Sequence, residues 1–446
     1  MQACPRTLFL LAALVSPALW PGPAPAQDEL WESSREAAAE AYSQGNYTEA
    51  EEQYVAALKA AQDFAPKDLR LALTLNGLAE VYRAQGRYAK AWLHHRHALA
   101  IREDTLGPDD PAVAESLHNL ALLYHTQGWH AEAEPLFERS VATFEKALGP
   151  NHPQVAVGLN NLAGFRQDQG RYGEAERLYK RALAILEREP GRDNPQLAAS
   201  LNNLAGLYHD QGNYAGAEQL YMRALAILER VLGPEHHRLA ASLTNLARLY
   251  HDQRRYDEAE TLYKRALSIK EKALGTDHAD VATGLNNLAE MHRTRGRSDV
   301  AEPLFARALA IYERVFGPEH PRVALSLNNL ALIYDARGDS AKAESFYKRA
   351  LEIIENTLGP QHPDLANSLN NLAILYQVQG RYEEAETNFV WALAIREDSL
   401  GLDHPSVGAS LEDYAALLRQ IGRSAEAAKM DKRAKAIRAK HLRDNP

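Results

Sequence analysis

Hydrophobic residues in this chain recur with the spacing of α-helices. Leu327, Leu330, Ala331 and Tyr334 follow an i, i+3, i+4, i+7 pattern, which places four apolar side chains on one face of a helix. A second apolar series with the same spacing follows Gly338. No segment shows the strict alternation that is typical of a β-strand. The pattern therefore predicts pairs of amphipathic helices in an all-α protein.

The pair of helices repeats every 42 residues. An Asn-Asn-Leu sequence marks each copy at residues 160–162, 202–204, 286–288, 328–330 and 370–372, with variants at 76–78, 118–120 and 244–246. Degenerate copies around residues 45 and 413 extend the series toward both ends. Residues 27–446 make 420 residues, or ten periods of 42. A single repeat array therefore fills this part of the chain and leaves no room for a second domain.

Glycine and proline mark the boundaries of the predicted helices. A glycine stands between the two helices of a pair, as a left-handed turn at the end of a helix requires, and only Arg254 breaks this column. Proline often occupies the first position of the next pair, where its missing N–H costs nothing. The glycines are Gly86, Gly128, Gly170, Gly212, Gly296, Gly338, Gly380 and Gly422, and the prolines include Pro153, Pro321, Pro363 and Pro405.

These residues carry a family resemblance. Leu-x-x-Leu-Ala-x-x-Tyr, followed by Ala-x-x-x-Tyr-x-x-Ala-Leu, resembles the tetratricopeptide repeat. The 42-residue form with Leu-Asn-Asn-Leu-Ala and Leu-Gly-x-x-His-Pro is similar to the repeats of kinesin light chains and their bacterial relatives, although the heptad segment of kinesin light chains has no counterpart here. The resemblance implies a right-handed α-solenoid, or superhelix, of about ten helix-turn-helix repeats. In such proteins the first helices line a concave groove that holds extended peptides or partner proteins.

The N-terminus reads as a secretory signal. Arg6 precedes an apolar stretch from Leu8 to Trp20, and Ala24-Pro25-Ala26 is a small-x-small cleavage sequence. Cleavage after Ala26 would release residues 27–446 into the periplasm or the medium. The alternative is an uncleaved membrane anchor. The only cysteine, Cys4, lies in the signal, so the mature chain would have neither disulfides nor a thiol nucleophile.

Composition and motifs give no support to an enzyme or a metalloprotein. The chain has 50 Lys and Arg against 59 Asp and Glu, and this acidity argues against a nucleic-acid partner. We find no His-Glu-x-x-His, phosphate loop or Gly-x-Ser-x-Gly sequence, so we expect no catalytic residues, no metal and no cofactor. A repeat enzyme acting on carbohydrate or another substrate would need a convergent carboxylate cluster, which the sequence does not offer.

Two groups of histidines suggest a metal at first sight. One column recurs once per repeat, and its members would lie about 10 Å apart, whereas ligands of one ion lie about 2 Å from it. Because Asp110 and Asn194 stand in the same column, we expect these side chains to cap helices. In the cluster formed by His94, His95 and His97, His95 falls in a slot that other repeats fill with Tyr, which predicts packing. The column comprises His152, His236, His278, His320, His362 and His404.

A column of asparagines, which we call the asparagine ladder, is the predicted binding site. The resemblance implies that these amides face the groove and bind peptide main chain, for which an amide has both a donor and an acceptor. The alternative is that they bridge adjacent first helices. We assign that bridging role to the preceding column, which contains Asn160, Asn202, Asn286, Asn328 and Asn370. The ladder comprises Asn119, Asn161, Asn203, Asn245, Asn287, Asn329 and Asn371.

Specificity is expected from positions on the same face that vary between repeats. Three and six residues after the ladder, the middle repeats carry His209, Arg248, His251 and Arg293. We expect this polar, cationic stretch to pair with acidic groups of a peptide. The alternative is a solvated face with local ion pairs.

The sequence therefore predicts a non-enzymatic scaffold for protein–protein interaction. An alternative is a structural assembly factor of the cell envelope that binds folded partners through its ends or convex face, for which Trp391 is a candidate contact. Residues 28–63 hold nine acidic and two basic residues, whereas residues 424–446 hold seven basic and three acidic ones. Attraction between these ends could also form homo-oligomers.

Overall fold

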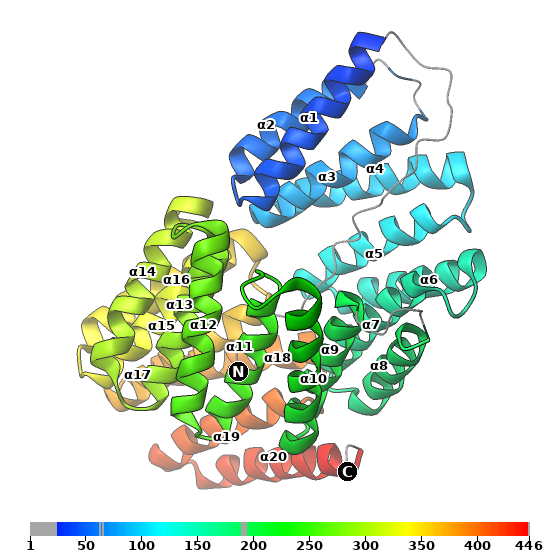
Figure 1. Ribbon diagram of the computed structural model, residues 1–446. Helices are drawn as coiled ribbons and strands as arrows, with labels where there is room; N and C mark the ends of the chain where they lie inside the picture. The colour runs from blue at the N-terminus through cyan, green and yellow to red at the C-terminus, as the bar shows by residue number, and fades with distance from the viewer. Residues whose placement is uncertain (1–24, 62–63, 65–66, 189–193, 445–446) are drawn as a thin grey trace. The chain divides into compact units, whose positions relative to one another are not determined.

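The computed structural model describes residues 25–61, 64, 67–188 and 194–444 (Figure 1). Over these residues the chain forms twenty helices in ten pairs and no strand, which confirms the all-α repeat fold predicted from the 42-residue period. Residues 1–24 of the predicted signal peptide lie outside the described residues, while Pro25 and Ala26 begin the first helix. Cleavage after Ala26 stays a prediction.

Each pair has a first and a second helix. The first helices are α1 (Pro25–Ser43), α3 (Leu69–Ala84), α5 (Pro111–Thr126), α7 (Pro153–Asp168), α9 (Pro195–Asp210), α11 (Leu239–Asp252), α13 (Ala279–Thr294), α15 (Pro321–Ala336), α17 (Pro363–Val378) and α19 (Pro405–Gln420). The second helices are α2 (Tyr47–Ala61), α4 (Tyr88–Leu106), α6 (His130–Leu148), α8 (Tyr172–Leu186), α10 (Tyr214–Leu232), α12 (Tyr256–Leu274), α14 (Ser298–Phe316), α16 (Ser340–Leu358), α18 (Tyr382–Leu400) and α20 (Ser424–Asp444).

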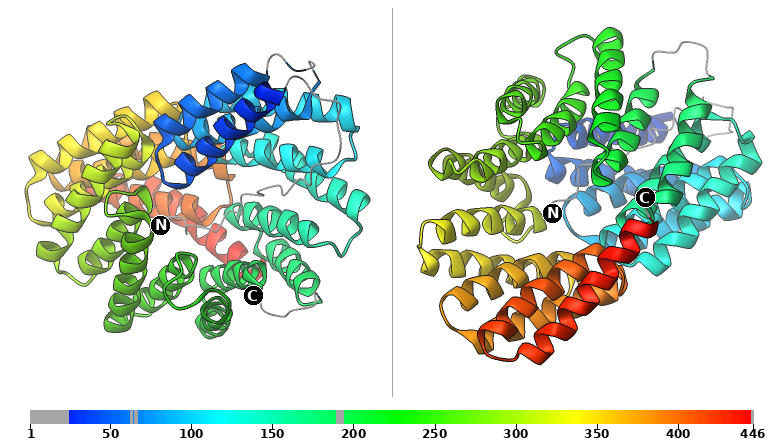
Figure 2. Two further views of the ribbon diagram at one scale, coloured as in Figure 1. Left: turned by 45° about the horizontal axis from the view of Figure 1, so that its top comes forward. Right: turned by 90° about the horizontal axis from the view of Figure 1, so that it is seen from below.

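The described residues pack as two compact units, one made of those up to residue 165 with those between 178 and 203, and the other of residues 166–177 with those from 204 onward. From α1 to α6 in the first unit and from α10 to α20 in the second, each helix packs on the helix that follows it. First helices also contact the next first helix, as α11 does with α13 and α17 with α19. Figure 2 shows this stacking for the second unit. First helices therefore form one layer within a unit, and second helices cover it.

The turn inside each pair has the predicted left-handed backbone. Gly338 has a φ of 80° and donates its N–H to the carbonyl oxygen of Asp335 over 2.9 Å. Arg254 keeps the same turn with a φ of 60°, and its N–H bonds the carbonyl oxygen of His251 over 2.9 Å. It is the one non-glycine residue with positive φ in the described part of the chain. Tertiary packing therefore imposes the turn even where the sequence lacks the residue that favours it.

The histidine column caps the first helices as predicted, with one exception. The Nδ1 atom of His278 accepts the N–H of Asp280 over 3.0 Å, and His320 accepts that of Arg322 over 3.1 Å. Three other members of the column accept the N–H two residues ahead over 3.1–3.2 Å. His236 accepts the N–H of Arg238 over 3.2 Å, but α11 begins only at Leu239, so this histidine does not cap its helix. Asp110 makes the equivalent bond over 2.8 Å. These imidazoles satisfy helix N–H groups that would otherwise have no partner.

The core lies between the two layers. In α16, Ala343, Tyr347 and Ala350 are all buried, and Tyr347 packs in a cluster that includes residues of α15, α17 and α18. Alanine lets neighbouring helices approach closely, while the aromatic ring fills the space between them. His95 occupies the slot of Tyr347 in its own repeat and is fully buried. Its ring nitrogens lie 3.0 Å from Asn76 Oδ1 and 3.2 Å from Glu80 Oε1, which confirms the predicted packing role.

Candidate functional site

The asparagine ladder lies on the first helices α5 to α17, and its members fall into two sets. Asn161, Asn245 and Asn329 are buried, with 7%, 5% and 4% of their surface exposed. None of these three is free of partners: Asn161, for example, places Nδ2 3.1 Å from His118 Nε2. The other set alternates with the first along the array and is half-buried. Its members are Asn119, Asn203, Asn287 and Asn371.

The half-buried set has amides that the protein leaves available. No side-chain hydrogen bond joins the amide of Asn119, Asn203, Asn287 or Asn371 to any other described residue. Each amide can still donate and accept. Ligand binding by all seven members stays a prediction. Among the described residues, four of the amides have no hydrogen-bond partner, whereas the other three already have partners in the protein.

The column before the ladder joins neighbouring first helices, as predicted for its role. Asn160 Nδ2 donates to Ser200 Oγ over 2.5 Å, and Asn328 Nδ2 donates to Ser368 Oγ over 2.6 Å. Asn76 and Asn286 make the same bond, over 3.3 Å, to the serine forty residues later. In α17, Asn370 instead donates to Asp413 over 2.9 Å. These bonds hold adjacent repeats in register.

The serine partner of this bridge was not predicted, although the sequence holds the signal for it. Where the serine position is glycine, at Gly158 and Gly284, the asparagine forty residues earlier is also absent. His118 stands opposite Gly158 and is buried against Phe137, with their ring centres 5.7 Å apart. Thr244 stands opposite Gly284 and turns its hydroxyl to the carbonyl of Ala240 over 2.7 Å. Comparing positions forty residues apart would have revealed the pairing.

The predicted specificity residues come together on α9, α11 and α13. His209 Nε2 lies 2.8 Å from Asp252 Oδ2, and His209 Nδ1 lies 3.2 Å from Arg248 Nη2. Asp210 is 4.0 Å from the same guanidinium. Burial raises the pKa of Asp252, but the hydrogen bond from His209 and the nearby charges of His209, His251 and Arg248 together outweigh burial and hold this pKa below its usual value. A network of opposite charges therefore occupies the middle of this face.

His251 and Arg293 also have partners within the protein. His251 Nε2 lies 2.5 Å from Thr294 Oγ1, and burial lowers the pKa of this imidazole. Arg293 donates two hydrogen bonds, of 2.7 and 2.6 Å, to the carboxylate of Glu290 on its own helix. An acidic ligand group would therefore have to compete with carboxylates of this same face. Its pairing with Arg248 and Arg293 stays a prediction.

A further recurring contact, missed by sequence reasoning, links several second helices to the next repeat. The hydroxyl of Tyr376 and the guanidinium of Arg381 both donate to Glu344, over 3.1 and 2.7 Å. Lys348 pairs with the same carboxylate over 2.6 Å, as its i, i+4 spacing predicts. The hydrogen bond from Arg381 is the main cause that lowers the pKa of Glu344 to about 2. Tyr250 and Arg255 clamp Glu218 in the same way. These clamps stiffen the scaffold behind the ladder.

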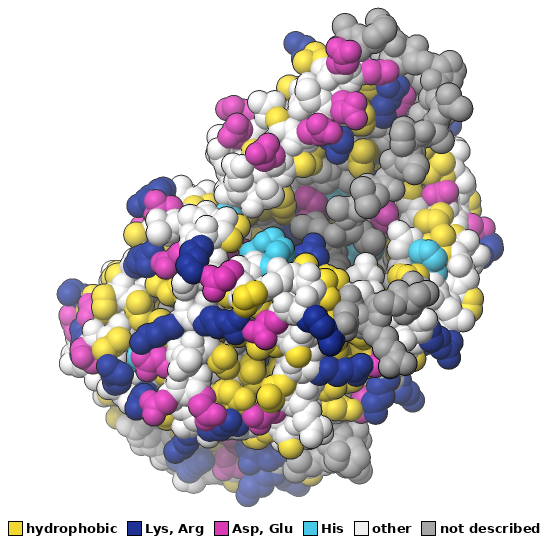
Figure 3. Space-filling model, in the orientation of Figure 1, with side chains coloured by type: hydrophobic (Ala, Val, Ile, Leu, Met, Phe, Trp, Pro, Cys, Tyr) yellow, Lys and Arg dark blue, Asp and Glu magenta, His cyan; other side chains and the backbone are white. Residues whose placement is uncertain are grey.

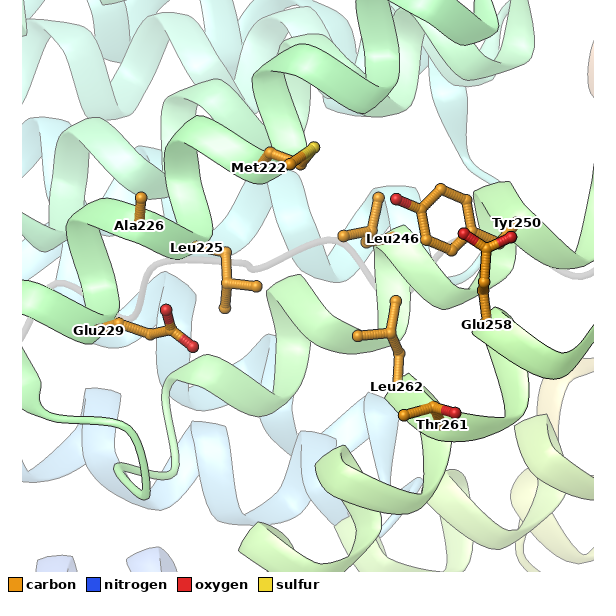
Figure 4. Close-up of a pocket in the computed structure, with 9 residues that line it drawn as sticks. All are labelled: Met222, Leu225, Ala226, Glu229, Leu246, Tyr250, Glu258, Thr261 and Leu262. Carbon is orange, nitrogen blue, oxygen red and sulfur yellow. The ribbon is translucent and has the colours of Figure 1, made fainter. Parts of the chain in front are cut away.

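A shallow apolar hollow lies away from the ladder, between the second helices α10 and α12 and over α11 (Figure 4). Its volume is about 460 Å³. Met222, which is 54% exposed, takes a position that Lys180, Lys264 and Lys348 hold in other repeats. Figure 3 shows hydrophobic side chains gathered over this part of α10 and α12. The lining residues are Met222, Leu225, Ala226, Glu229, Leu246, Tyr250, Glu258, Thr261 and Leu262.

Among the described residues, no group of three or more His, Cys, Asp or Glu side chains is placed to hold a metal ion. In the same residues, no helix combines the length and the apolar character needed to cross a membrane. Trp391, the candidate outward contact, is half-buried and packs against the core cluster of α13 to α18.

Comparison with known proteins gives a family for the chain. One tetratricopeptide repeat profile matches residues 33–104, 70–146, 113–188, 154–229, 197–272, 280–356, 337–398 and 364–440, and a second matches residues 244–315. No curated protein matches this sequence.

Solved structures resemble parts of the chain. BtubC (BKLC) of P. vanneervenii is 27% identical over 53% of this chain and 92% of its own, with a TM-score of 0.42. A putative kinesin light chain of Podosopora anserina with nearly identical TPR-like repeats is 29% identical over 46% of this chain and 98% of its own, with a TM-score of 0.39. A Rap protein complexed with competence and sporulation factor is 16% identical over 84% of this chain and all of its own, with a TM-score of 0.54. With repeat matches running from residue 33 to residue 440, the chain belongs to the tetratricopeptide repeat family.

Proposed function

We propose that this protein is a non-enzymatic scaffold that holds an extended segment of a partner protein along its first helices. Tetratricopeptide repeat proteins bind protein partners, and these repeats account for most of the chain. The observation that supports the location is the set of four half-buried ladder amides that have no partner among the residues that the structure describes. An extended peptide has N–H and C=O groups that such amides can pair with, whatever its side chains are.

Two further points support this proposal. The Rap protein, which shares the fold, was solved in complex with competence and sporulation factor, so a fold of this kind can hold a partner. The bridges and clamps between repeats keep the ladder positions fixed before any ligand arrives. Rigid placement of binding groups reduces the entropy lost on association.

The proposed place of action is outside the cytoplasm. The support is the leading segment of the sequence, in which Arg6, an apolar stretch and Ala24-Pro25-Ala26 follow one another in the order of a secretory signal. We therefore look for partners in the cell envelope or the medium. Export is tested by expressing the full chain and sequencing the N-terminus of the mature protein, which we expect to begin at Gln27.

A capture experiment with matched variants tests the binding role. Asn287→Ala with Asn371→Ala removes two available amides, whereas Asn245→Ala with Asn329→Ala removes two engaged ones. We expect the first variant to capture less partner from a cell-envelope extract while keeping the wild-type melting temperature. The second should melt earlier, because its amides have partners in the protein. Equal capture of the same partner by the wild type and the first variant would contradict the proposal.

The hollow between α10 and α12 supports a second candidate function, an assembly factor of the cell envelope that binds folded partners through the second helices. Met222 exposes an apolar side chain where three of the described repeats carry Lys180, Lys264 and Lys348, and exposed apolar positions of this kind favour protein contacts. Met222→Lys would introduce the side chain of those three repeats. Loss of partner capture in this variant, with the ladder intact, would favour this second function.

A further inference from the structure

A second series of side-chain contacts joins neighbouring first helices in the second unit. In each contact one side chain stands six residues after the ladder and its partner stands seven residues after the ladder of the next repeat, and we call this series the seam. Like the bridge before the ladder, the seam links helices about one repeat apart in sequence. The contacts are Gln167 to Asp210 over 2.5 Å, His209 to Asp252 over 2.8 Å, His251 to Thr294 over 2.5 Å and Gln377 to Gln420 over 2.8 Å.

The seam is interrupted between α13 and α17. The accepting positions there are Ala336 and Val378, which have no polar side-chain atom. Arg293 turns back to Glu290 on its own helix. The carboxylate of Asp335 has no hydrogen bond or ion pair to any other described residue, and its burial raises its pKa. A partly buried carboxylate without a partner is costly for the protein alone.

Apolar side chains are exposed at the same interruption. Val378 is 78% exposed, the largest fraction for any large hydrophobic residue in the described part of the chain. Ile374, one turn earlier on α17, is 38% exposed. The register that brings Gln377 to Gln420 places Asp335 beside Val378. A negative charge and an apolar strip therefore adjoin each other on the ladder side of two neighbouring first helices.

We propose that a partner peptide seats a lysine or arginine side chain on Asp335 and an apolar side chain on Val378 and Ile374. This inference rests on the proposed function and names the ligand chemistry of that same face. The cationic end of the ligand side chain supplies the donor that the carboxylate lacks, while its methylene groups cover Val378. In an extended peptide, alternate side chains point the same way and lie about 7 Å apart. The basic and apolar residues of the ligand therefore stand two positions apart.

Fluorescence anisotropy with defined peptides tests this inference on the mature full-length chain. The probe is a short fluorescein-labelled Gly-Ser peptide that carries Lys-Ser-Leu, and the comparison peptides carry Glu-Ser-Leu and Lys-Ser-Ser. We expect Lys-Ser-Leu to bind roughly tenfold more tightly than either. Glu-Ser-Leu lacks the charge-assisted hydrogen bond, which is worth about one to two factors of ten, and Lys-Ser-Ser lacks the apolar side chain that would cover Val378 and Ile374. Asp335→Asn and Val378→Ser should each weaken its binding. Asp398→Asn, an exposed carboxylate on α18, and Leu402→Ser are the matched controls and should leave it unchanged.

A charge reversal distinguishes recognition from damage to the fold. Asp335→Lys should bind Glu-Ser-Leu more tightly than Lys-Ser-Leu, which a misfolded variant would not do. Equal binding of all three peptides, absence of binding, or wild-type affinity in Asp335→Asn and Val378→Ser would overturn the inference. The capture experiment with Asn287→Ala and Asn371→Ala does not depend on the charge of the ligand. Capture that needs the ladder, together with peptides that do not discriminate, would reject this inference and keep the proposed function.

Discussion

His118 should make the protein sensitive to mild acid. Its imidazole is buried, and this burial lowers its pKa from 6.5 to about 4. The neutral ring is therefore the form that the fold tolerates, whereas the unfolded chain takes up a proton near pH 6.5. The contribution of this group to the unfolding free energy is fully present above pH 6.5 and is lost progressively as the pH falls toward 4. His118→Asn, which introduces the residue found at this position in most repeats, removes the titration.

The size of the effect follows from the two pKa values. Between pH 7.5 and pH 5, a shift from 6.5 to about 4 removes about 2 kcal/mol of unfolding free energy. Other groups titrate equally in the wild type and in the variant, so their contribution cancels in the comparison. Urea unfolding at both pH values measures the loss for each protein. We expect the wild type to lose about 2 kcal/mol more than His118→Asn over this interval.

Exposed His97, on α4, provides the control. His97→Asn should leave the difference between the two pH values as it is in the wild type. Any change in packing against Phe137 alters the unfolding free energy of His118→Asn equally at both pH values. It therefore does not affect the difference in unfolding free energy between pH 7.5 and pH 5. An equal loss of stability in the wild type and in His118→Asn would refute the reasoning, because a buried neutral imidazole has to be charged on unfolding in acid.

Three other predictions concern single contacts. Arg254→Gly should raise the unfolding free energy by about 0.5–1 kcal/mol, because a side chain in the left-handed region costs more than the added flexibility of glycine, whereas Arg254→Ala should give no gain in urea unfolding. Asn328→Ala should cost about 1–3 kcal/mol by leaving the buried Ser368 hydroxyl without its donor, and a double-mutant cycle with Ser368→Ala should show coupling; purely additive losses would exclude the bridge. Arg381→Ala should return the pKa of Glu344 from about 2 toward its usual value, as a carboxyl NMR titration would show. In the wild type this carboxylate adds to the unfolding free energy above its unfolded pKa, and the contribution is lost as the pH falls toward 2. The contribution should be smaller in the variant.

Much of the fold could be predicted because a helix pair is a local structure. Periodic apolar residues define each helix, and glycine and proline define its ends, so the boundaries at Gly338 and Pro321 were visible in the sequence. The repeat period then fixed the stacking of neighbouring pairs. Arg254 shows the limit of local rules, since the left-handed turn persists there against the preference of the residue.

The site was harder to predict, because it depends on contacts between repeats. A column in the alignment gives the position of a side chain within its helix, but not its neighbour forty residues away. Asn161 and Asn287 occupy the same column, yet His118 lies against Asn161 while Asn287 has no partner among the described residues. The cationic side chains Arg248 and Arg293 could be identified from the sequence, whereas their pairing with the carboxylates of Asp210 and Glu290 is seen only in the structure. Burial and pairing of such groups are properties of the packed array.

The central claim is that partners bind along the ladder, and site-specific photo-crosslinking in living cells tests it most directly. A photo-reactive amino acid would replace Asn371 in one strain and Met222, in the hollow between α10 and α12, in another. Both positions can be substituted without removing a hydrogen bond to another described residue. We predict that the partner is crosslinked from position 371 and not from position 222. Crosslinking from position 222 alone would contradict the account and place binding on the second helices.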